Sequence, residues 1–200
     1  KRKKRQPTNV YIVVVDPRNT ETSKAADLHI SISPGTDLAL LHGIGHLLLF
    51  NSKFDNDFIE NATDNFPAYA KLLTNWTPDR VSAICGIPET HLHELARLWG
   101  RSNGVLSLWS MGINQRREGT AVVGGLINLH LMTGEIGKAG AGPFSLTGQP
   151  NAMGGREAGG LAHLLPGYRH VTNAEDRAEI EQAWRMKAGS IAAKPGLTAW

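Results

Sequence analysis

Apolar runs alternate with amphipathic segments along the chain, a pattern typical of strands that take turns with helices. The β-branched run Asn9–Val15 predicts a strand buried on both faces of a parallel sheet. Asp27–Ile32 alternates like a second strand, and Val105–Ser110 predicts a third. Strands separated by helices predict an α/β domain with a Rossmann-like, doubly wound and mostly parallel sheet flanked by helices.

Helices are predicted from caps, breakers and apolar periodicity. Leu38–Phe50 follows a Pro-Gly-Thr-Asp start and is apolar nearly all round, which predicts a buried helix. Further helices are predicted over Phe54–Asn75, Thr77–Cys85, the segment between Pro88 and Gly104, Gly119–Gly134 and Ala174–Lys187. We therefore expect an α/β domain over residues 1–141 and a C-terminal helix with a truncated tail over 174–200.

A glycine-rich stretch, GPFSLTGQPNAMGGREAGG, occupies Gly142–Gly160. Neither helical nor strand periodicity runs through it, which predicts a long loop region over 142–173. Its six glycines let the main chain approach a ligand closely. A flexible linker is the alternative, but linkers lack apolar residues such as Phe144, Leu146 and Met153. The composition favours a loop that lines a ligand.

Charge and hydropathy narrow the class of protein. The net charge of the 200 residues is +3, and a basic run over Lys1–Arg5 accounts for more than all of it. A nucleic-acid-binding face is therefore not expected. No apolar run reaches the roughly 20 residues of a membrane span, and no signal peptide is recognised. We expect a cytoplasmic location without membrane contact. Because the chain starts at Lys1 without methionine and stops at Trp200, we expect a piece of a longer polypeptide.

Polar clusters follow two of the predicted strands. The first cluster is Asp16-Pro17-Arg18-Asn19-Thr20, and the second is Met111-Gly112-Ile113-Asn114-Gln115. In a doubly wound sheet both clusters emerge at the same edge and can line one crevice. A carboxylate there commonly holds ribose hydroxyls or a base edge, although Asp16 can equally satisfy turn amides. Gly35-Thr36-Asp37 opens a helix and can take an anion or a nucleotide edge, or is simply a cap.

Other polar residues give weaker signals. Arg156 stands among glycines, and its planar guanidinium suits a small oxyanion, with Glu157 as the alternative anchor. His42 and His46 are four apart, as metal ligands can be, but no third ligand is apparent, and core histidines are favoured. The single cysteine, Cys85, excludes an internal disulfide and a multi-cysteine metal site in these residues and is interpreted as a buried structural thiol.

Four segments together resemble the molybdenum bis(molybdopterin guanine dinucleotide) oxidoreductases. They are VVVDPRNTETSKAADLHISISPGTDLALL, WSMGINQ, INLHLMTGEIGKAGAGPFSLTGQPNAMGGREAGG and LPGYRHVTNAEDR. DPR…T and PGTDLA are shared broadly across the superfamily, whereas GPFSLTGQPNAMGGRE points to nitrate reductases. The resemblance is closest to a central part of the assimilatory nitrate reductase catalytic subunit, with periplasmic nitrate reductases and formate dehydrogenases as relatives.

The resemblance implies roles for particular residues. The segments that match Asp16–Thr20 and Gly35–Asp37 contact a pterin guanine dinucleotide in the family. Residues that match Met111 and Gln115 also lie on this cofactor, and the methionine lies near the metal. Arg156 matches an arginine of the substrate funnel, where it would orient nitrate.

The implied reaction is reduction of nitrate to nitrite by oxygen-atom transfer at molybdenum, with electrons from an iron–sulfur cluster. The cysteines that bind the metal and the cluster lie upstream in the family, so no metal ligand is expected here and the segment is expected to be inactive alone. Expected partners are nitrate, the rest of the same polypeptide and an electron donor such as ferredoxin, flavodoxin or a nicotinamide-linked reductase. The alternatives are a segment of a formate dehydrogenase or of another superfamily member, and a non-catalytic nucleotide-binding or assembly module.

Overall fold

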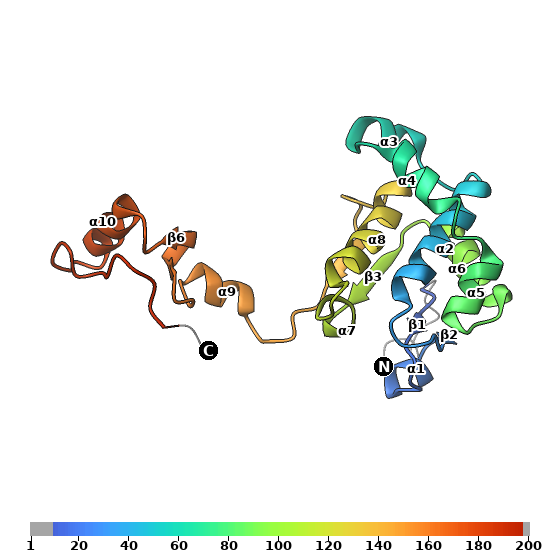
Figure 1. Ribbon diagram of the computed structural model, residues 1–200, viewed down its shortest axis with the longest axis horizontal. Helices are drawn as coiled ribbons and strands as arrows, with labels where there is room; N and C mark the ends of the chain where they lie inside the picture. Colours follow the sequence, from blue (N-terminus) through green and yellow to red (C-terminus); the bar gives the residue numbers. More distant parts are fainter. Residues whose placement is uncertain (1–9, 198–200) are drawn as a thin grey trace. The chain divides into compact units, whose positions relative to one another are not determined.

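The computed structural model describes residues 10–197, in two compact units. The first unit ends at Leu146 and the second begins at Thr147 (Figure 1). The basic run Lys1–Arg5, the first residue of the strand predicted from Asn9, and residues 198–200 of the predicted tail lie outside the described residues. The predicted division into an α/β domain over 1–141, a ligand-lining region over 142–173 and a C-terminal part over 174–200 stays a prediction.

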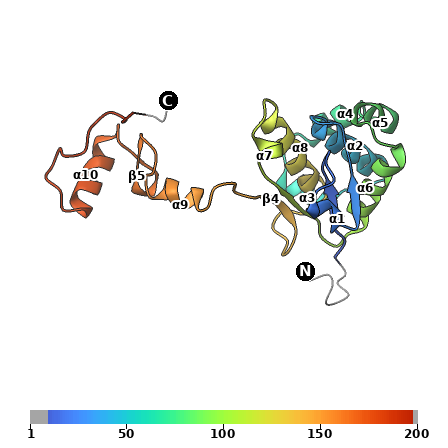
Figure 2. The same cartoon turned by 90° about the horizontal axis from the view of Figure 1, so that it is seen from below.

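The first unit mixes helices with short parallel strands (Figure 2). In chain order it contains β1 (Val13–Val15), α1 (Glu21–Lys24), β2 (Leu28–Ile30), α2 (Asp37–Phe50), α3 (Asn56–Ala62), α4 (Phe66–Leu73), α5 (Pro78–Cys85), α6 (Glu89–Arg101), β3 (Leu106–Trp109), α7 (Met111–Asn114), α8 (Gly119–Met132) and β4 (Gly142–Ser145). An α/β arrangement with parallel strands is therefore confirmed.

The strands pair in twos. β1 runs parallel to β2, with Val13 opposite Leu28, and β3 runs parallel to β4, with Leu106 opposite Gly142. Among the described residues these pairs are separate two-stranded sheets, so a single doubly wound sheet is not seen there. Parallel pairs need crossover connections, and α1 lies in the connection between β1 and β2, whereas α7 and α8 lie in the connection between β3 and β4.

Helix α2 is the centre of the first unit and packs against α4, α5, α6 and α8 (Figure 1). Ten of its 14 residues are buried, which confirms the prediction of a buried helix. Close approach of the neighbours requires small residues: a Cβ on Gly43 would lie 2.8 Å from Val81 on α5, and one on Gly45 would lie 3.0 Å from Leu73 on α4. The apolar faces of five helices thereby form one core.

The prediction of one continuous helix over Phe54–Asn75 is wrong, because this stretch forms two helices, α3 and α4. Thr63 has an extended backbone, and Asn65 adopts a left-handed φ of 60°. Pro67 explains the break: it has no N–H to donate in a helix interior, but it fits the first turn of a new helix. The proline and glycine signals of α5 are confirmed, since Pro78 lies in its first turn and Gly86 is left-handed after its end, but the Thr77 side chain makes no capping hydrogen bond.

The second unit contains α9 (Ala152–Glu157), β5 (Leu164–Leu165), the 3-10 helix η1 (Pro166–Tyr168), β6 (Arg169–His170) and α10 (Ala174–Ala183). β5 and β6 are antiparallel, and Leu165, Val171 and Ile180 form a small core. The prediction of a loop without structure over 142–173 is therefore wrong, since β4, α9 and this hairpin lie within it.

The last helix is shorter than predicted. It ends at Ala183, with Trp184 as an exposed C-cap, and Arg185 adopts a left-handed φ of 55° that stops the helix before Lys187. Within the described part of the chain, no helix has the length and apolar character needed to cross a membrane.

Candidate functional site

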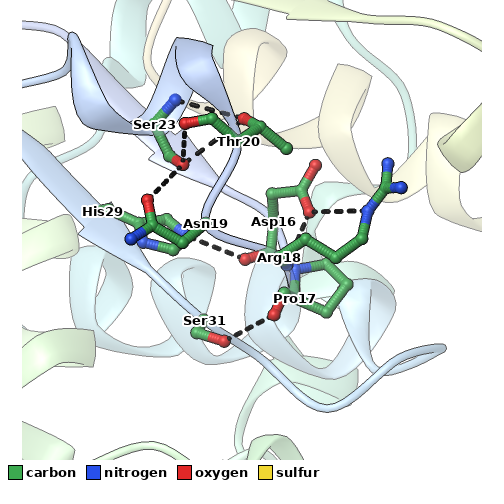
Figure 3. A network of polar contacts seen from close by, with 8 residues as sticks. All are labelled: Asp16, Pro17, Arg18, Asn19, Thr20, Ser23, His29 and Ser31. Carbon is green, nitrogen blue, oxygen red and sulfur yellow. Dashed lines mark hydrogen bonds and ion pairs between the residues drawn. The ribbon is translucent and has the colours of Figure 1, made fainter.

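The cluster after β1 is a tight turn with its own hydrogen bonds (Figure 3). The Arg18 amide donates to Asp16 Oδ1 at 2.7 Å, and Thr20 Oγ1 accepts from the Ser23 amide to cap α1. Asp16 thus accepts a hydrogen bond from a turn amide, which is the structural alternative that the sequence gives for this residue. The Arg18 side chain nevertheless remains 83% exposed, and Asp16 is only partly covered. The turn presents both a carboxylate and a guanidinium to solvent.

Two side chains around β2 anchor this turn (Figure 3). His29 Nε2 lies 2.8 Å from the carbonyl oxygen of Asp16, and Ser31 Oγ donates to the carbonyl oxygen of Pro17 at 3.0 Å. Sequence reasoning missed both residues. His29 and Ser31 are two residues apart in a strand pattern, which puts their side chains on the same side of the strand, and this spacing is the sequence feature that could have identified them.

The segment after β2 leads into α2. Gly35 adopts a φ of +90°, which favours glycine, and Thr36 Oγ1 donates to the carbonyl oxygen of Ser33 instead of capping the helix. Asp37 is the first residue of α2. Cys85 lies against this segment, with Sγ 3.7 Å from the Thr36 carbonyl oxygen, and burial raises the pKa of its thiol. The interpretation of a buried cysteine is confirmed.

The cluster after β3 forms a short helix, α7, where the sequence predicted only a polar segment. Met111 and Gln115 are exposed, and the Gln115 amide closes the turn by donating to the Met111 carbonyl oxygen. The next residue, Arg116, reaches back to α2: Nη1 lies 2.5 Å from Asp37 Oδ2, and Nη2 donates to the Gly35 carbonyl oxygen at 2.8 Å.

The structure joins two of the three predicted segments of the first unit by a direct contact. Arg116, which follows the second segment, binds Asp37 and Gly35 of the third, whereas the first segment is bonded to His29 and Ser31 at β2 and its end. Sequence reasoning missed Arg116, and nothing in the sequence alone distinguishes it from its neighbour Arg117.

Arg156 lies on α9 in the second unit and is exposed. Its guanidinium has no hydrogen bond or ion pair within residues 10–197, so the alternative anchor on Glu157 is not seen. The side chain is available for an external anion.

A cavity of about 450 Å³ in the first unit is lined by none of the predicted site residues of that unit. It is lined by Asp55, Trp99 and Glu135 among others, and Glu135 Oε2 accepts from the Val105 amide at the start of β3. The cavity is thus at the opposite end of β3 from Met111.

His42 and His46 are buried in α2, where His46 Nδ1 lies 2.9 Å from the Leu73 carbonyl oxygen, so both are core histidines as predicted.

The family model of the molybdopterin oxidoreductases matches residues 1–195 of this chain. This chain belongs to the molybdopterin oxidoreductase family. It is 54% identical over 196 residues to a nitrate reductase of Synechocystis, with 98% of this chain and 28% of that protein covered. It is 43% identical over 206 residues to the periplasmic nitrate reductase of Desulfovibrio desulfuricans, with 98% and 27% covered.

Two further proteins are similar to this chain at lower sequence identity. Formate dehydrogenase H of Escherichia coli is 33% identical over 177 residues, with 88% of this chain and 25% of that protein covered. Among solved structures, acetylene hydratase from Pelobacter acetylenicus is similar in fold, with a TM-score of 0.61 at 21% identity over 64% of this chain and 18% of that one. The chain spans about a quarter of the length of the curated relatives it matches.

Membership of the molybdopterin oxidoreductases implies a molybdopterin cofactor, and the polar groups of the first unit fit one. Such a cofactor carries phosphate and a ring edge with donors and acceptors. Arg18 supplies an exposed cation, Gln115 an exposed amide, and Asp16 a partly open carboxylate. These groups come from the segments that follow β1 and β3.

Proposed function

We propose that this chain is a central part of the catalytic subunit of an assimilatory nitrate reductase. The observation that carries the proposal is the identity of 54% and 43% to two proteins named nitrate reductase, across nearly the whole chain. A relative named as an assimilatory catalytic subunit, from Bacillus subtilis, is 33% identical over 197 residues. We further propose a cytoplasmic location for the complete enzyme.

The first unit holds the guanine dinucleotide form of the cofactor in this proposal. The carboxylates of Asp16 and Asp37 accept hydrogen bonds from ribose hydroxyls or from the guanine edge. Arg18 and the open backbone at Gly35 provide contacts for the phosphates. Asn19, Thr20 and Thr36 flank these groups, and Met111 and Gln115 lie along the pterin.

The chemistry is divided between the cofactor and the protein. When bound, the molybdenum cofactor would supply the two electrons and the oxygen-atom transfer that convert nitrate to nitrite. Arg156 orients the anion, because its planar guanidinium matches a planar trigonal oxyanion with two parallel hydrogen bonds. Electrons come from ferredoxin, flavodoxin or a nicotinamide-linked reductase, through an iron–sulfur cluster held by another part of the polypeptide.

The rest of the same polypeptide covers one face of β3 and β4. Leu106 and Leu108 on β3 and Phe144 on β4 are 46%, 57% and 52% exposed, and the register places Leu108 opposite Phe144. The other face is covered, since Trp109 is buried and Ser107 contacts α8 through His130. Because parallel sheets are normally covered on both faces, this apolar face supports a larger, doubly wound sheet in the complete protein.

The test uses the complete protein that contains this chain, purified from its source. We expect molybdenum and a guanine nucleotide in the purified protein, nitrite production from nitrate with a reduced viologen dye, and no growth of a deletion strain on nitrate as the sole nitrogen source. Oxidation of formate without nitrite production would assign the chain to a formate dehydrogenase instead. Absence of both molybdenum and turnover would favour a non-catalytic nucleotide-binding module.

A further inference from the structure

We propose that Arg116 is a positioning residue that fixes Asp37 for the guanine nucleotide and thereby sets how tightly this nucleotide is held. The inference rests on the proposed function and adds to it a residue outside the predicted set. Its basis is the double contact of one guanidinium with the carboxylate of Asp37 and the carbonyl oxygen of Gly35.

All three nitrogens of the Arg116 guanidinium are directed at protein groups. Nη1 lies 2.5 Å from Asp37 Oδ2, Nη2 lies 2.8 Å from the Gly35 carbonyl oxygen, and Nε lies 3.7 Å from Glu118 Oε2. Two of the five N–H donors of the guanidinium therefore bind the segment at the start of α2, and this double contact makes Arg116 a positioning residue for Asp37. A carboxylate has about four acceptor sites, so Asp37 can bind Arg116 and still accept from a ligand.

The Arg116–Asp37 ion pair is more buried than the Arg18–Asp16 ion pair. Its two side chains are 19% and 23% exposed, whereas Arg18 and Asp16 are 83% and 31% exposed and 3.9 Å apart. Exposed pairs contribute little because solvent screens them and both side chains lose freedom. The half-buried, short pair holds its geometry better and fixes where the Asp37 carboxylate lies.

The backbone on either side of Arg116 is held as well. The Gln115 amide donates to the Met111 carbonyl oxygen, and the Gly119 amide donates to the Arg116 carbonyl oxygen at 3.0 Å. Arg116 thus joins the end of α7 to the start of α2, across a separation of 79 residues. The two segments proposed to contact the cofactor are fixed relative to each other before it binds, and such preorganisation lowers the cost of binding.

The positive charge of Arg116 also favours binding of the nucleotide. An unpaired carboxylate at Asp37 would repel the phosphates of a nucleotide, and Arg116 compensates that charge at 2.5 Å. Replacing Arg116 by an uncharged residue removes both the positional and the electrostatic effect, whereas lysine keeps the charge and only one of the two contacts.

The experiment measures guanine nucleotide in the complete, cofactor-loaded protein. Wild type, Arg116→Gln, Arg116→Lys and the control Arg117→Gln are purified, and the nucleotide released by acid is quantified per protein before and after incubation in dilute urea. Arg117 is an exposed arginine next in sequence whose side chain makes no hydrogen bond or ion pair within residues 10–197, so its substitution matches the charge change. We expect nucleotide loss to be on the order of tenfold faster in Arg116→Gln, intermediate in Arg116→Lys and unchanged in Arg117→Gln.

A double variant separates positioning from a general loss of structure. If Arg116 acts through Asp37, then Arg116→Gln adds little to the faster loss already caused by Asp37→Asn. The KM for nitrate of the loaded fraction stays at the wild-type value. Wild-type retention in both Arg116 variants, or equal effects of Arg116→Gln and Arg117→Gln, or full additivity with Asp37→Asn, would overturn the inference. Absence of guanine nucleotide from the wild-type protein would instead refute the proposed function.

Discussion

His130 Nε2 lies 2.8 Å from Ser107 Oγ, and this contact joins α8 to β3. His130 is fully buried, its ring lies 4.9 Å from the ring of Trp99, and its Nδ1 has no hydrogen-bond partner among the described residues. Burial lowers the pKa of His130 to about 4. The core therefore holds this imidazole in its neutral form at neutral pH.

We predict that the free energy of unfolding decreases as the pH falls below 6.5. The unfolded chain takes up a proton at the ordinary histidine pKa of 6.5, whereas folded His130 does so only near pH 4, so acid favours the unfolded state. The total loss between these values is roughly 3 kcal/mol. His42, whose pKa is also lowered by burial, contributes in the same direction. Urea unfolding followed by circular dichroism at several pH values measures the slope.

The matched variants are His130→Gln and His93→Gln. The first removes the buried ring, so the slope should become shallower even if the stability at neutral pH also falls. The second replaces an exposed histidine of α6 and should keep the wild-type slope. Equal slopes in wild type and His130→Gln would contradict this account.

Two glycines should respond to alanine in opposite ways. A Cβ on Gly43 would lie 2.8 Å from Val81 and 3.1 Å from Leu92, whereas a Cβ on Gly124 in α8 would have nothing within 4 Å. We predict that Gly43→Ala lowers the free energy of unfolding by about 1–3 kcal/mol through overpacking. Gly124→Ala should raise it by about 0.5–1 kcal/mol, because alanine loses less backbone entropy in a helix. Urea unfolding compares them, and a shared sign would refute the packing argument.

Features decided by neighbours in sequence could be predicted, and α5 is an example. Pro78 starts it, and Gly86 is left-handed after its end, each within a few residues of the signal. The break at Asn65 could also have been predicted, because Pro67 lies inside the predicted helix. Phe58, Ala62 and Phe66 have the spacing of four that favours one helix, but Pro67 ends that helix and starts a new one.

Features decided by distant parts of the chain could not be predicted. Gly142–Ser145 begins with glycine and proline, which are rare inside strands, and it becomes β4 only by pairing with β3. The candidate site shows the same limit. The polar segments after the strands were found from sequence, but the contact of Arg116 with Asp37 spans 79 residues and distinguishes Arg116 from Arg117 only in the folded chain.

Glu181 is predicted to hold the turn that follows α10. Its Oε2 accepts from the Gly189 amide at 2.8 Å and its Oε1 from the Ile191 amide at 2.7 Å, and these bonds lower the pKa of Glu181. Glu181→Gln can accept only one of the two bonds, so the Gly189 and Ile191 amides should exchange hydrogen faster. Glu175→Gln, an exposed carboxylate in the first turn of α10, is the control. Unchanged exchange in Glu181→Gln would show that the turn does not depend on this side chain.

The apolar face of β3 and β4 should be buried in the complete protein. Leu108 is 57% exposed in this chain, whereas Trp109, the next residue, is buried. We predict that a cysteine introduced by Leu108→Cys reacts readily with a thiol reagent in the 200-residue chain and on the order of tenfold more slowly in the complete protein. The native Cys85 is buried, and labelling is measured on the peptide that contains position 108, so that other cysteines of the complete protein do not contribute. Equal labelling in the two proteins would mean that this face remains open.

Arg156 is predicted to act on nitrate and not on stability, because its exposed guanidinium has no partner within residues 10–197. Losing hydrogen bonds from a charged donor to an anion costs about 1.5–3 kcal/mol, so Arg156→Ala in the complete enzyme should lower kcat/KM for nitrate on the order of 10- to 100-fold. Arg156→Lys keeps the charge without the planar fork and should recover only part of that loss. Lys187→Ala removes an exposed positive charge elsewhere in the second unit and should leave kcat/KM unchanged. The thermal midpoint and the molybdenum content should match wild type in all three variants, so that a lower rate reports on the substrate. Wild-type kinetics in Arg156→Ala would remove this residue from the substrate site while leaving the nucleotide contacts of the first unit open to their own test.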